Sequence, residues 1–300
     1  MNSNNPRKIF MTGASGGLGR KLLDSLLREF PMTHFVLLVH RAKIDVRKED
    51  VGRVRLVSGS LADSTLLHEA LLGVDTIVHV AAITHALDPE LYKEVNTLGT
   101  KNLVTEGKRA GVSRILQVST TALGGDCGAY GASKSSAEDI VRKSGIPFTI
   151  VRLGEMYGAG SGEGIDQLIT STGNMPFAPY VVNTYMAPVS VLDVIFAFTQ
   201  TLCVPASNKT YILAGPEVLS FREVVIQVLA AKKKWAVPLP VSKSLLSLFV
   251  HTTRRVKSDQ VERLYGKKDY NNTTSKNDLL FSPRTFRDGL VGVFGNDEHQ

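Results

Sequence analysis

The sequence predicts an α/β fold, in which a doubly wound parallel sheet is followed by a smaller, mostly helical C-terminal portion. Six short apolar runs in the first half, rich in Val, Ile and Leu, have the length of β-strands. Their near-continuous apolar character is typical of strands in a sheet that is covered on both faces. Helix-period segments separate several of these runs, and this alternation predicts right-handed βαβ units. A chain of 300 residues, 43% of them apolar, is long enough for one large domain with a smaller cap.

The elements of the first half follow one another closely. Strands are predicted over 8–13, 35–40, 54–59, 75–82, 114–120 and 147–153, and helices over 19–30 and 97–111. In the second helix Leu98, Leu103 and Val104 supply much of an inward face, and Gly111 suits a C-cap.

After Val151 the alternation loosens. Segments 158–166 and 172–188 carry Gly and Pro and are predicted to be loops, whereas 190–202, 220–231 and 242–256 are predicted helices and 210–215 a further strand. We therefore predict one domain over 1–154 and a second portion over 155–300. The last sheet strands, about 187–215, are interleaved with that second portion.

Composition excludes several classes of protein. No stretch approaches eighteen uncharged apolar residues, so we expect no integral membrane span, and the N-terminus lacks the apolar core of a signal peptide. Cys127 and Cys203 form no disulfide framework, which favours the cytoplasm. The net charge of +7 gathers at 232–234 and 254–257, without aromatic interleaving or a nucleic-acid motif, so no nucleic-acid partner is expected. The histidines at 79, 85 and 251 show no ligand spacing, and no metal site is predicted.

A glycine-rich turn lies at the first strand–helix junction. "MTGASGGLGR" places Gly13, Gly16 and Gly19 there, where glycine permits a tight turn and a close approach to pyrophosphate. The N–H groups of the following helix can bind the same anion. The next strand is followed by Arg41, with His40 and Lys43 beside it, rather than by an acid. This favours NADP(H) over NAD(H), because arginine accommodates a 2′-phosphate.

With "TGASGGLG", "HVAAITH", "NTLGTKNL" and "YGASK" in this order, the chain resembles the extended, or atypical, short-chain dehydrogenase/reductase superfamily, in its NAD-dependent epimerase/dehydratase-like branch. The resemblance implies a Rossmann-type NAD(P)-binding domain over 1–154 and a substrate-binding portion over 155–300. It also implies a homodimer built on the helix of Tyr130. The cofactor-binding residues that the motifs imply are Gly13, Ser15, Gly16, Leu18, Gly19, Arg41, Ser60, Leu61, Val80, Ala81, Ala82, Asn96, Ser119, Tyr130 and Lys134.

Tyr130 and Lys134 match the catalytic pair of that superfamily, with Thr121 as the hydroxyl that binds the substrate oxygen. Residues four apart share one face of a helix, and a nearby ammonium lowers the pKa of a phenol. Thr120, Glu155 and Tyr157 are predicted on the substrate side. For Glu155, however, an exposed loop acid is the favoured interpretation, and for Tyr157 packing is favoured. Only nine residues separate Thr121 from Tyr130, which predicts a more open site than in the sugar-modifying members.

Three functions remain open at this point. The first is an NAD(P)-dependent oxidoreductase or epimerase acting on a carbonyl or carbinol of a nucleoside-diphosphate sugar, of the 4-ketoreductase or 4-epimerase type. The second is a reductase of a non-sugar carbonyl in a small-molecule substrate, of sterol, flavonoid or aldehyde type. The third is a non-catalytic NADPH-binding accessory or sensor protein.

Overall fold

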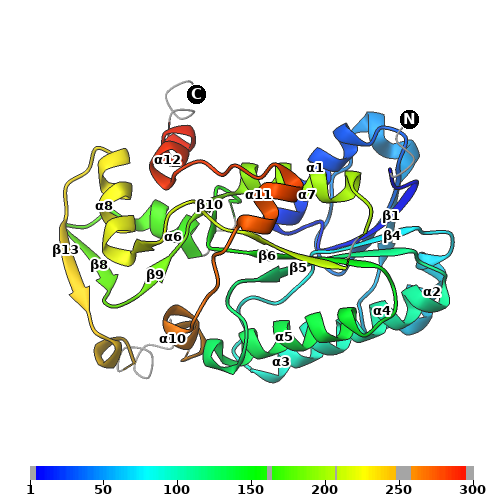
Figure 1. The fold of residues 1–300 in the computed structure, drawn as a ribbon, viewed down its shortest axis with the longest axis horizontal. Coiled ribbons are helices and arrows are strands. Elements are labelled where there is room, and N and C mark those ends of the chain that lie inside the picture. The colour runs from blue at the N-terminus through cyan, green and yellow to red at the C-terminus, as the bar shows by residue number, and fades with distance from the viewer. Residues whose placement is uncertain (1–4, 161–163, 207, 248–257, 295–300) are drawn as a thin grey trace. The chain divides into compact units, whose positions relative to one another are not determined.

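The computed structural model describes residues 5–160, 164–206, 208–247 and 258–294 (Figure 1). The chain forms two compact units, each built from separate stretches. The first unit comprises residues 1–120, 129–152 and 195–211, and the second comprises 121–128, 153–194 and 212–300. The chain first leaves the first unit after Thr120, returns to it over residues 129–152, and returns again near Ile195.

A seven-stranded sheet carries most of the first unit. Its strand order is β11-β6-β5-β4-β1-β2-β3. The strands are β1 (Lys8–Thr12), β2 (His34–Val39), β3 (Val54–Ser58), β4 (Thr76–His79), β5 (Arg114–Thr120), β6 (Phe148–Leu153) and β11 (Lys209–Leu213). β1 pairs in parallel with both β2 and β4, so the strand order reverses at β1. In a doubly wound sheet, ligands bind at the carboxyl ends of the strands at this reversal.

Helices cover both faces of this sheet. They are α1 (Gly17–Glu29), α2 (Ser64–Leu71), α3 (Glu90–Tyr92), α4 (Gly99–Arg109), α5 (Gly128–Arg142) and α7 (Val191–Cys203), with a 3-10 turn η1 (Lys48–Arg53) and a π-helical turn η2 (Lys93–Leu98). In Figure 1, α2, α4 and α5 lie on the face of the sheet opposite α1. The buried side chains between α2, α4, α5 and the sheet include Phe10, Ile77, Leu103, Ile115 and Ile150. α2 begins where the Asp63 carboxylate accepts the Leu66 N–H at 3.0 Å, a side-chain N-cap.

The second unit contains three two-stranded pairs and several helices. The strands are β7 (Met156–Tyr157) with β10 (Val189–Ser190), β9 (Tyr185–Met186) with β12 (Leu219–Ser220), and β8 (Phe177–Val181) with β13 (Val237–Val241). The helices are α6 (Gly164–Ser171), α8 (Phe221–Ala231), α10 (Ser258–Tyr265), α11 (Thr273–Leu279) and α12 (Phe286–Phe294), with a 3-10 turn η3 (Gly125–Cys127). Tyr157, Met186, Val224, Phe286 and Leu290 belong to one apolar cluster of buried side chains in this unit.

The structure corrects several predicted elements. The segment 172–188, predicted as loop, contains β8 and β9, and β13 lies in a region predicted to be mostly helical. β8 and β13 are held by pairing with each other, and such tertiary pairing leaves little local signal. β4 ends at His79, before the predicted residue 82. The predicted helix over 242–256 and the basic cluster at 254–257 lie partly or wholly outside the described residues.

Candidate active site

The turn after β1 requires glycine at two positions. Gly13 has φ +75°, and a Cβ there would lie 2.6 Å from the Ala81 backbone nitrogen. A Cβ on Gly19 would overlap the Gly13 carbonyl oxygen. At Gly16 the nearest atom to such a Cβ is 3.5 Å away, so steric crowding does not explain this glycine.

Gly16 instead begins α1 as its N-cap, with no side-chain cap and no acid in the first turn. The first N–H groups of a helix lack partners within the helix, and they bind anions readily. Ser15 and Leu18, on either side of this helix start, are half-buried. The turn therefore fits the pyrophosphate of a dinucleotide.

The adjoining strand ends carry the other predicted cofactor residues. Val80, Ala81 and Ala82 are half-buried after β4, and the Ala81 N–H donates to the Thr12 hydroxyl at 3.2 Å. Arg41 is exposed after β2. After β3, the Ser60 hydroxyl accepts from the Ala62 N–H at 3.2 Å. The buried Leu61 carbonyl accepts from the Asn102 amide at 3.0 Å.

A buried hydrogen-bond chain through His79 joins the glycine turn to the helix layer. Thr12 Oγ1 lies 2.8 Å from His79 Nδ1, and His79 Nε2 lies 2.9 Å from Thr100 Oγ1. The Thr100 hydroxyl donates to the Asn96 carbonyl at 2.6 Å, so it accepts from Nε2–H, and Thr12 donates to Nδ1. Burial, and then the charge of Lys134, lower the pKa of His79 to about 3, so the ring is neutral. Sequence reasoning considered His79 only as a metal ligand and missed this role.

Asn96 lies on the π-helical turn η2, a local distortion frequent at functional sites. Its amide exchanges two bonds with the Ile83 backbone, at 2.8 and 3.0 Å, and donates to the Ser133 hydroxyl at 3.1 Å. Ser133 in turn donates to the Tyr130 carbonyl at 2.7 Å. Asn96 therefore fixes the segment after β4 against the first turn of the tyrosine helix.

Tyr130 and Lys134 lie one turn apart on α5, and both are buried. The Tyr130 ring packs edge-on against Tyr92, with centroids 5.9 Å apart. The Lys134 ammonium donates to the Val118 carbonyl at 2.8 Å, on the same strand as the buried Ser119. Burial lowers the pKa of Lys134 to about 8, against the opposing charge of Glu138. A lysine with this pKa changes charge close to neutral pH, as residues at catalytic sites often do.

Glu138 continues the stripe of Tyr130 and Lys134 by another turn. Its buried carboxylate accepts from Arg152 at 2.7 and 2.9 Å and from Arg142 at 3.2 Å. Burial raises the pKa of Glu138, but the hydrogen bonds and the charge of Arg152, with a further hydrogen bond from Arg142, outweigh burial and lower it overall. The ionised Glu138 therefore favours the charged form of Lys134. Its spacing four residues after Lys134 was the signal that sequence reasoning missed.

The remaining predicted residues divide between the units. Thr120 ends β5, half-buried, in the first unit, whereas Thr121 is buried in the second unit, where its N–H donates to the Leu153 carbonyl at 2.9 Å. Tyr157 is also fully buried in the second unit, edge-on to Phe286 with centroids 5.1 Å apart, and burial raises its pKa. This geometry agrees with the packing role that the sequence favours.

Glu155 follows β6 in the second unit and is held from three sides. It accepts from the Lys268 ammonium at 2.9 Å, from the Tyr270 hydroxyl at 2.9 and 3.0 Å, and from the Ala187 N–H at 3.2 Å. Burial, followed by the charge of Glu155, raises the pKa of Tyr270, which therefore stays a donor. Neither Lys268 nor Tyr270 could be predicted from the sequence, because more than a hundred residues separate them from Glu155.

The part of the chain that the structure describes contains neither a cluster of metal ligands nor a membrane-spanning helix. No group of three His, Cys, Asp or Glu side chains there is placed to hold a metal ion. Among the same residues, no helix has the length and apolar character to cross a membrane.

Comparison with known proteins places this site in a family. A family model described as NAD(P)H-binding matches residues 13–176. The UDP-glucose 4-epimerase of Vibrio cholerae is 27% identical over 320 residues, covering 95% of this chain and 94% of that protein. A 4-hydroxy-2-methyl-3-oxo-4-farnesyl-3,4-dihydroquinoline-1-oxide ketoreductase of Stigmatella aurantiaca is 29% identical over 184 residues, 54% of each chain.

Solved structures share the fold. The Bordetella bronchiseptica enzyme WbmG, in complex with NAD and UDP, superposes with a TM-score of 0.77 at 19% identity, covering 98% of this chain and 96% of that one. The glycine turn, the Tyr130–Lys134 pair and the matched family model agree. The chain therefore belongs to the extended short-chain dehydrogenase/reductase superfamily, in its epimerase/dehydratase-like branch of NAD(P)-dependent oxidoreductases.

Proposed function

We propose that the chain acts on a carbonyl or carbinol of a nucleoside-diphosphate sugar, as a 4-ketoreductase or 4-epimerase, with Tyr130 as acid/base. The observation that carries this proposal is the buried Lys134 one turn from Tyr130 on α5, with its pKa lowered to about 8. The Vibrio cholerae relative is named for a nucleotide sugar, and it matches nearly the whole chain. The second unit is then the substrate-binding portion.

A bound nicotinamide cofactor would supply or accept the hydride. Tyr130 donates its phenolic proton to the substrate oxygen during reduction and takes a proton back during oxidation. The positive charge of the Lys134 ammonium favours the phenolate form of Tyr130. One N–H of this ammonium donates to the Val118 carbonyl, and its other N–H groups suit the hydroxyls of the cofactor ribose. Thr121 would hold the substrate oxygen by its hydroxyl, and Thr120 and Glu155 are retained as substrate-side residues. Tyr157 remains on that side as a packing residue.

The test is Tyr130→Phe, with Tyr211→Phe as a matched buried control in β11. General acid–base catalysis contributes about 10²- to 10⁴-fold, so kcat should fall by at least that lower figure, a far larger loss than any loss of NADPH affinity measured separately. Turnover is followed by cofactor oxidation with 4-keto nucleotide sugars and by epimer formation from UDP-glucose. Unchanged turnover in Tyr130→Phe would refute the catalytic role.

We also propose that the cofactor is NADP(H). Arg41 and His40 are exposed at the carboxyl end of β2, and no acid takes the place that would bind a ribose 2′-hydroxyl. Arg41→Ala should weaken NADPH binding by about 10- to 150-fold, because a charge-assisted hydrogen bond contributes roughly 1.5–3 kcal/mol. NADH, which lacks the 2′-phosphate, is the internal control. Equal losses for the two cofactors would contradict the assignment.

Two alternative functions differ in substrate or in turnover. A non-sugar carbonyl substrate is favoured by the Stigmatella aurantiaca relative, whose name describes a farnesylated quinoline ketone. A substrate screen should then show turnover with apolar ketones and none with nucleotide sugars. Tight NADPH binding with no turnover in any screen would favour the third function, a non-catalytic NADPH-binding protein.

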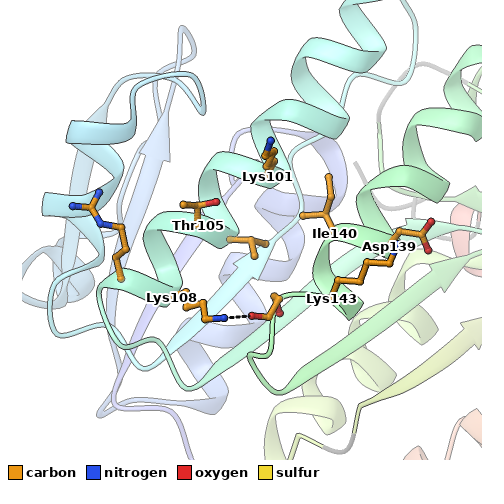
Figure 2. Close-up of a pocket in the computed structure, with 9 residues that line it drawn as sticks. Lys101, Thr105, Lys108, Asp139, Ile140 and Lys143 are labelled. Atoms are coloured by element: carbon orange, nitrogen blue, oxygen red, sulfur yellow. Dashed lines mark hydrogen bonds between the residues drawn. The ribbon is translucent and has the colours of Figure 1, made fainter.

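A homodimer through α4 and α5 is the assembly that we propose. Figure 2 shows a surface cavity of about 620 Å³ between these helices. Lys101, Lys108, Arg109 and Lys143 are among its lining residues, with Asp139 as the acid. The exposed side chains of Asp88, Glu90 and Glu94 lie toward the other end of this helix layer. A two-fold axis across the helices would bring each cationic end against an acidic end of the partner.

The dimer proposal is tested by Lys101→Glu/Lys143→Glu, with Lys48→Glu on η1 as the control. The double variant should sediment as a monomer while the control remains a dimer. A parent protein that is monomeric, or a double variant that stays dimeric, would overturn this interface.

We also propose that the protein is located in the cytoplasm, because Cys127 and Cys203 are free thiols.

A further inference from the structure

An apolar surface in the second unit has no role in the proposed reaction. The paired strands β8 and β13 form a ribbon, and α8 packs against one face of it, with Ala178, Val225 and Leu229 buried between them (Figure 1). The register places Phe177 beside Val237 and Pro179 beside Leu239. Side chains two apart along a strand share a face, so these four residues lie together on the other face of the ribbon.

That second face is exposed and carries no charge. Phe177 is 52% exposed, Val237 41% and Leu239 47%, and two further exposed apolar residues lie two positions before β8 and β13, Met175 at 67% and Trp235 at 81%. Contiguous exposed apolar surface on a folded protein marks a site of interaction. We refer to these residues, with Pro179, as the ribbon face.

The described chain next to the ribbon face is cationic. From 224 to 247 the sequence holds four lysines and no arginine, aspartate or glutamate. Lys233 and Lys234 are exposed immediately before Trp235, and Lys243 is exposed just after β13. Lys232 differs, because its ammonium donates to three carbonyls at the end of α6, at 2.7 to 3.0 Å.

The outer edge of β13 does not favour the addition of a strand. The Val237 N–H donates toward β8, to the Pro176 carbonyl at 2.9 Å, so the N–H positions of residues 238 and 240 face the outer edge of β13. Both residues are proline and have no N–H. A symmetric contact between two copies of this surface would also bring like charges together. A second copy of the chain is therefore a poor occupant.

We propose that the ribbon face binds the surface of an anionic lipid bilayer peripherally. Trp235 and Phe177 would enter the headgroup boundary, where aromatic rings are favoured, while Lys233, Lys234 and Lys243 face anionic headgroups. A nucleic acid would instead require cations across the face itself, which is aliphatic and aromatic. The proposal concerns attachment alone and does not depend on the substrate.

Trp235 is the single tryptophan of the chain and reports directly on this contact. Its fluorescence should shift to the blue, and become shielded from acrylamide, with phosphatidylcholine vesicles containing about one quarter phosphatidylglycerol, an anionic surface. Vesicles of phosphatidylcholine alone should bind more weakly, and raised salt should weaken binding to the anionic vesicles. No binding by the full chain, or sedimentation with an unchanged Trp235 spectrum, would overturn the proposal.

Two variants test the two parts of the surface. Lys233→Gln/Lys234→Gln should lower partitioning onto anionic vesicles about 25-fold, taking roughly fivefold for each cation near an anionic surface. Lys276→Gln/Arg287→Gln, exposed elsewhere in the second unit, is its control. Trp235→Ser/Phe177→Ser should abolish sedimentation with either vesicle, whereas Val291→Ser, 66% exposed on α12, should not. Equal effects of variant and control, or a changed oligomeric mass in place of lost vesicle binding, would refute the lipid assignment.

Discussion

Replacing Lys134 by methionine should remove turnover and make the protein more stable. Lys134 is buried, and its pKa is lowered from 10.5 to about 8. Each unit of pKa shift corresponds to about 1.36 kcal/mol, so holding the ammonium charged in the folded state at pH 7 costs about 3 kcal/mol. Methionine removes this cost but leaves the Val118 carbonyl without its donor, a loss of about 1–3 kcal/mol. Because the two effects oppose each other, the expected net gain is up to about 2 kcal/mol.

The pH dependence identifies the cause of that gain. Between pH 8 and 10.5 the unfolded chain keeps the Lys134 proton and the folded chain loses it, so the stability of the parent rises with pH. The advantage of Lys134→Met should therefore be full below pH 8 and fade by pH 10.5. Urea unfolding of parent and variant at several pH values measures the difference. A variant that is less stable at pH 7, or an advantage that does not change with pH, would refute the reasoning.

Three further predictions concern Gly13, His79 and Tyr270. Gly13→Ala should abolish NADPH binding and destabilise the protein by about 2–4 kcal/mol, because Gly13 has a positive φ and a Cβ there would meet the Ala81 nitrogen. The control Gly52→Ala should do neither, since nothing lies within 4 Å of its Cβ position. NADPH titrations that are equal for the two variants would contradict this prediction. The neutral His79, with its pKa lowered to about 3, should withdraw up to about 4 kcal/mol of stability as the pH falls from 6.5 towards 3, and acid titration of His79→Gln should lack this loss. Tyr270→Phe should cost about 1–3 kcal/mol, because Glu155 loses a donor, and an unchanged thermal midpoint would show that this bond adds nothing.

Local patterns were sufficient to predict the strands of the central sheet and the turn after β1. The strands are short apolar runs, geometry requires two of the glycines that mark the turn, and Tyr130 and Lys134 are four apart on one helix. The sequence placed the carboxyl end of β4 only approximately, since the chain from residue 80 onward keeps its apolar character after pairing has stopped.

Contacts made over a long distance along the chain were not predictable. His79 acquires its role from Thr12 on β1, 67 residues earlier, and from Thr100 on helix α4. β13 was missed because its pairing with β8 depends on the fold rather than on its composition, which contains two prolines. Lys268 and Tyr270 are ordinary polar residues in sequence, and only the folded second unit brings them to Glu155.

The discontinuous units also constrain the order in which the central sheet can be completed during synthesis. β11 completes the seven-stranded sheet beside β6, but it is synthesised after all of residues 153–194, which belong to the second unit. During synthesis, β6 must therefore wait as an open edge until about residue 213 has emerged from the ribosome. Ribosome-bound chains that end before β11 should expose that edge to chaperones, and no single cut in the gene can separate the two units.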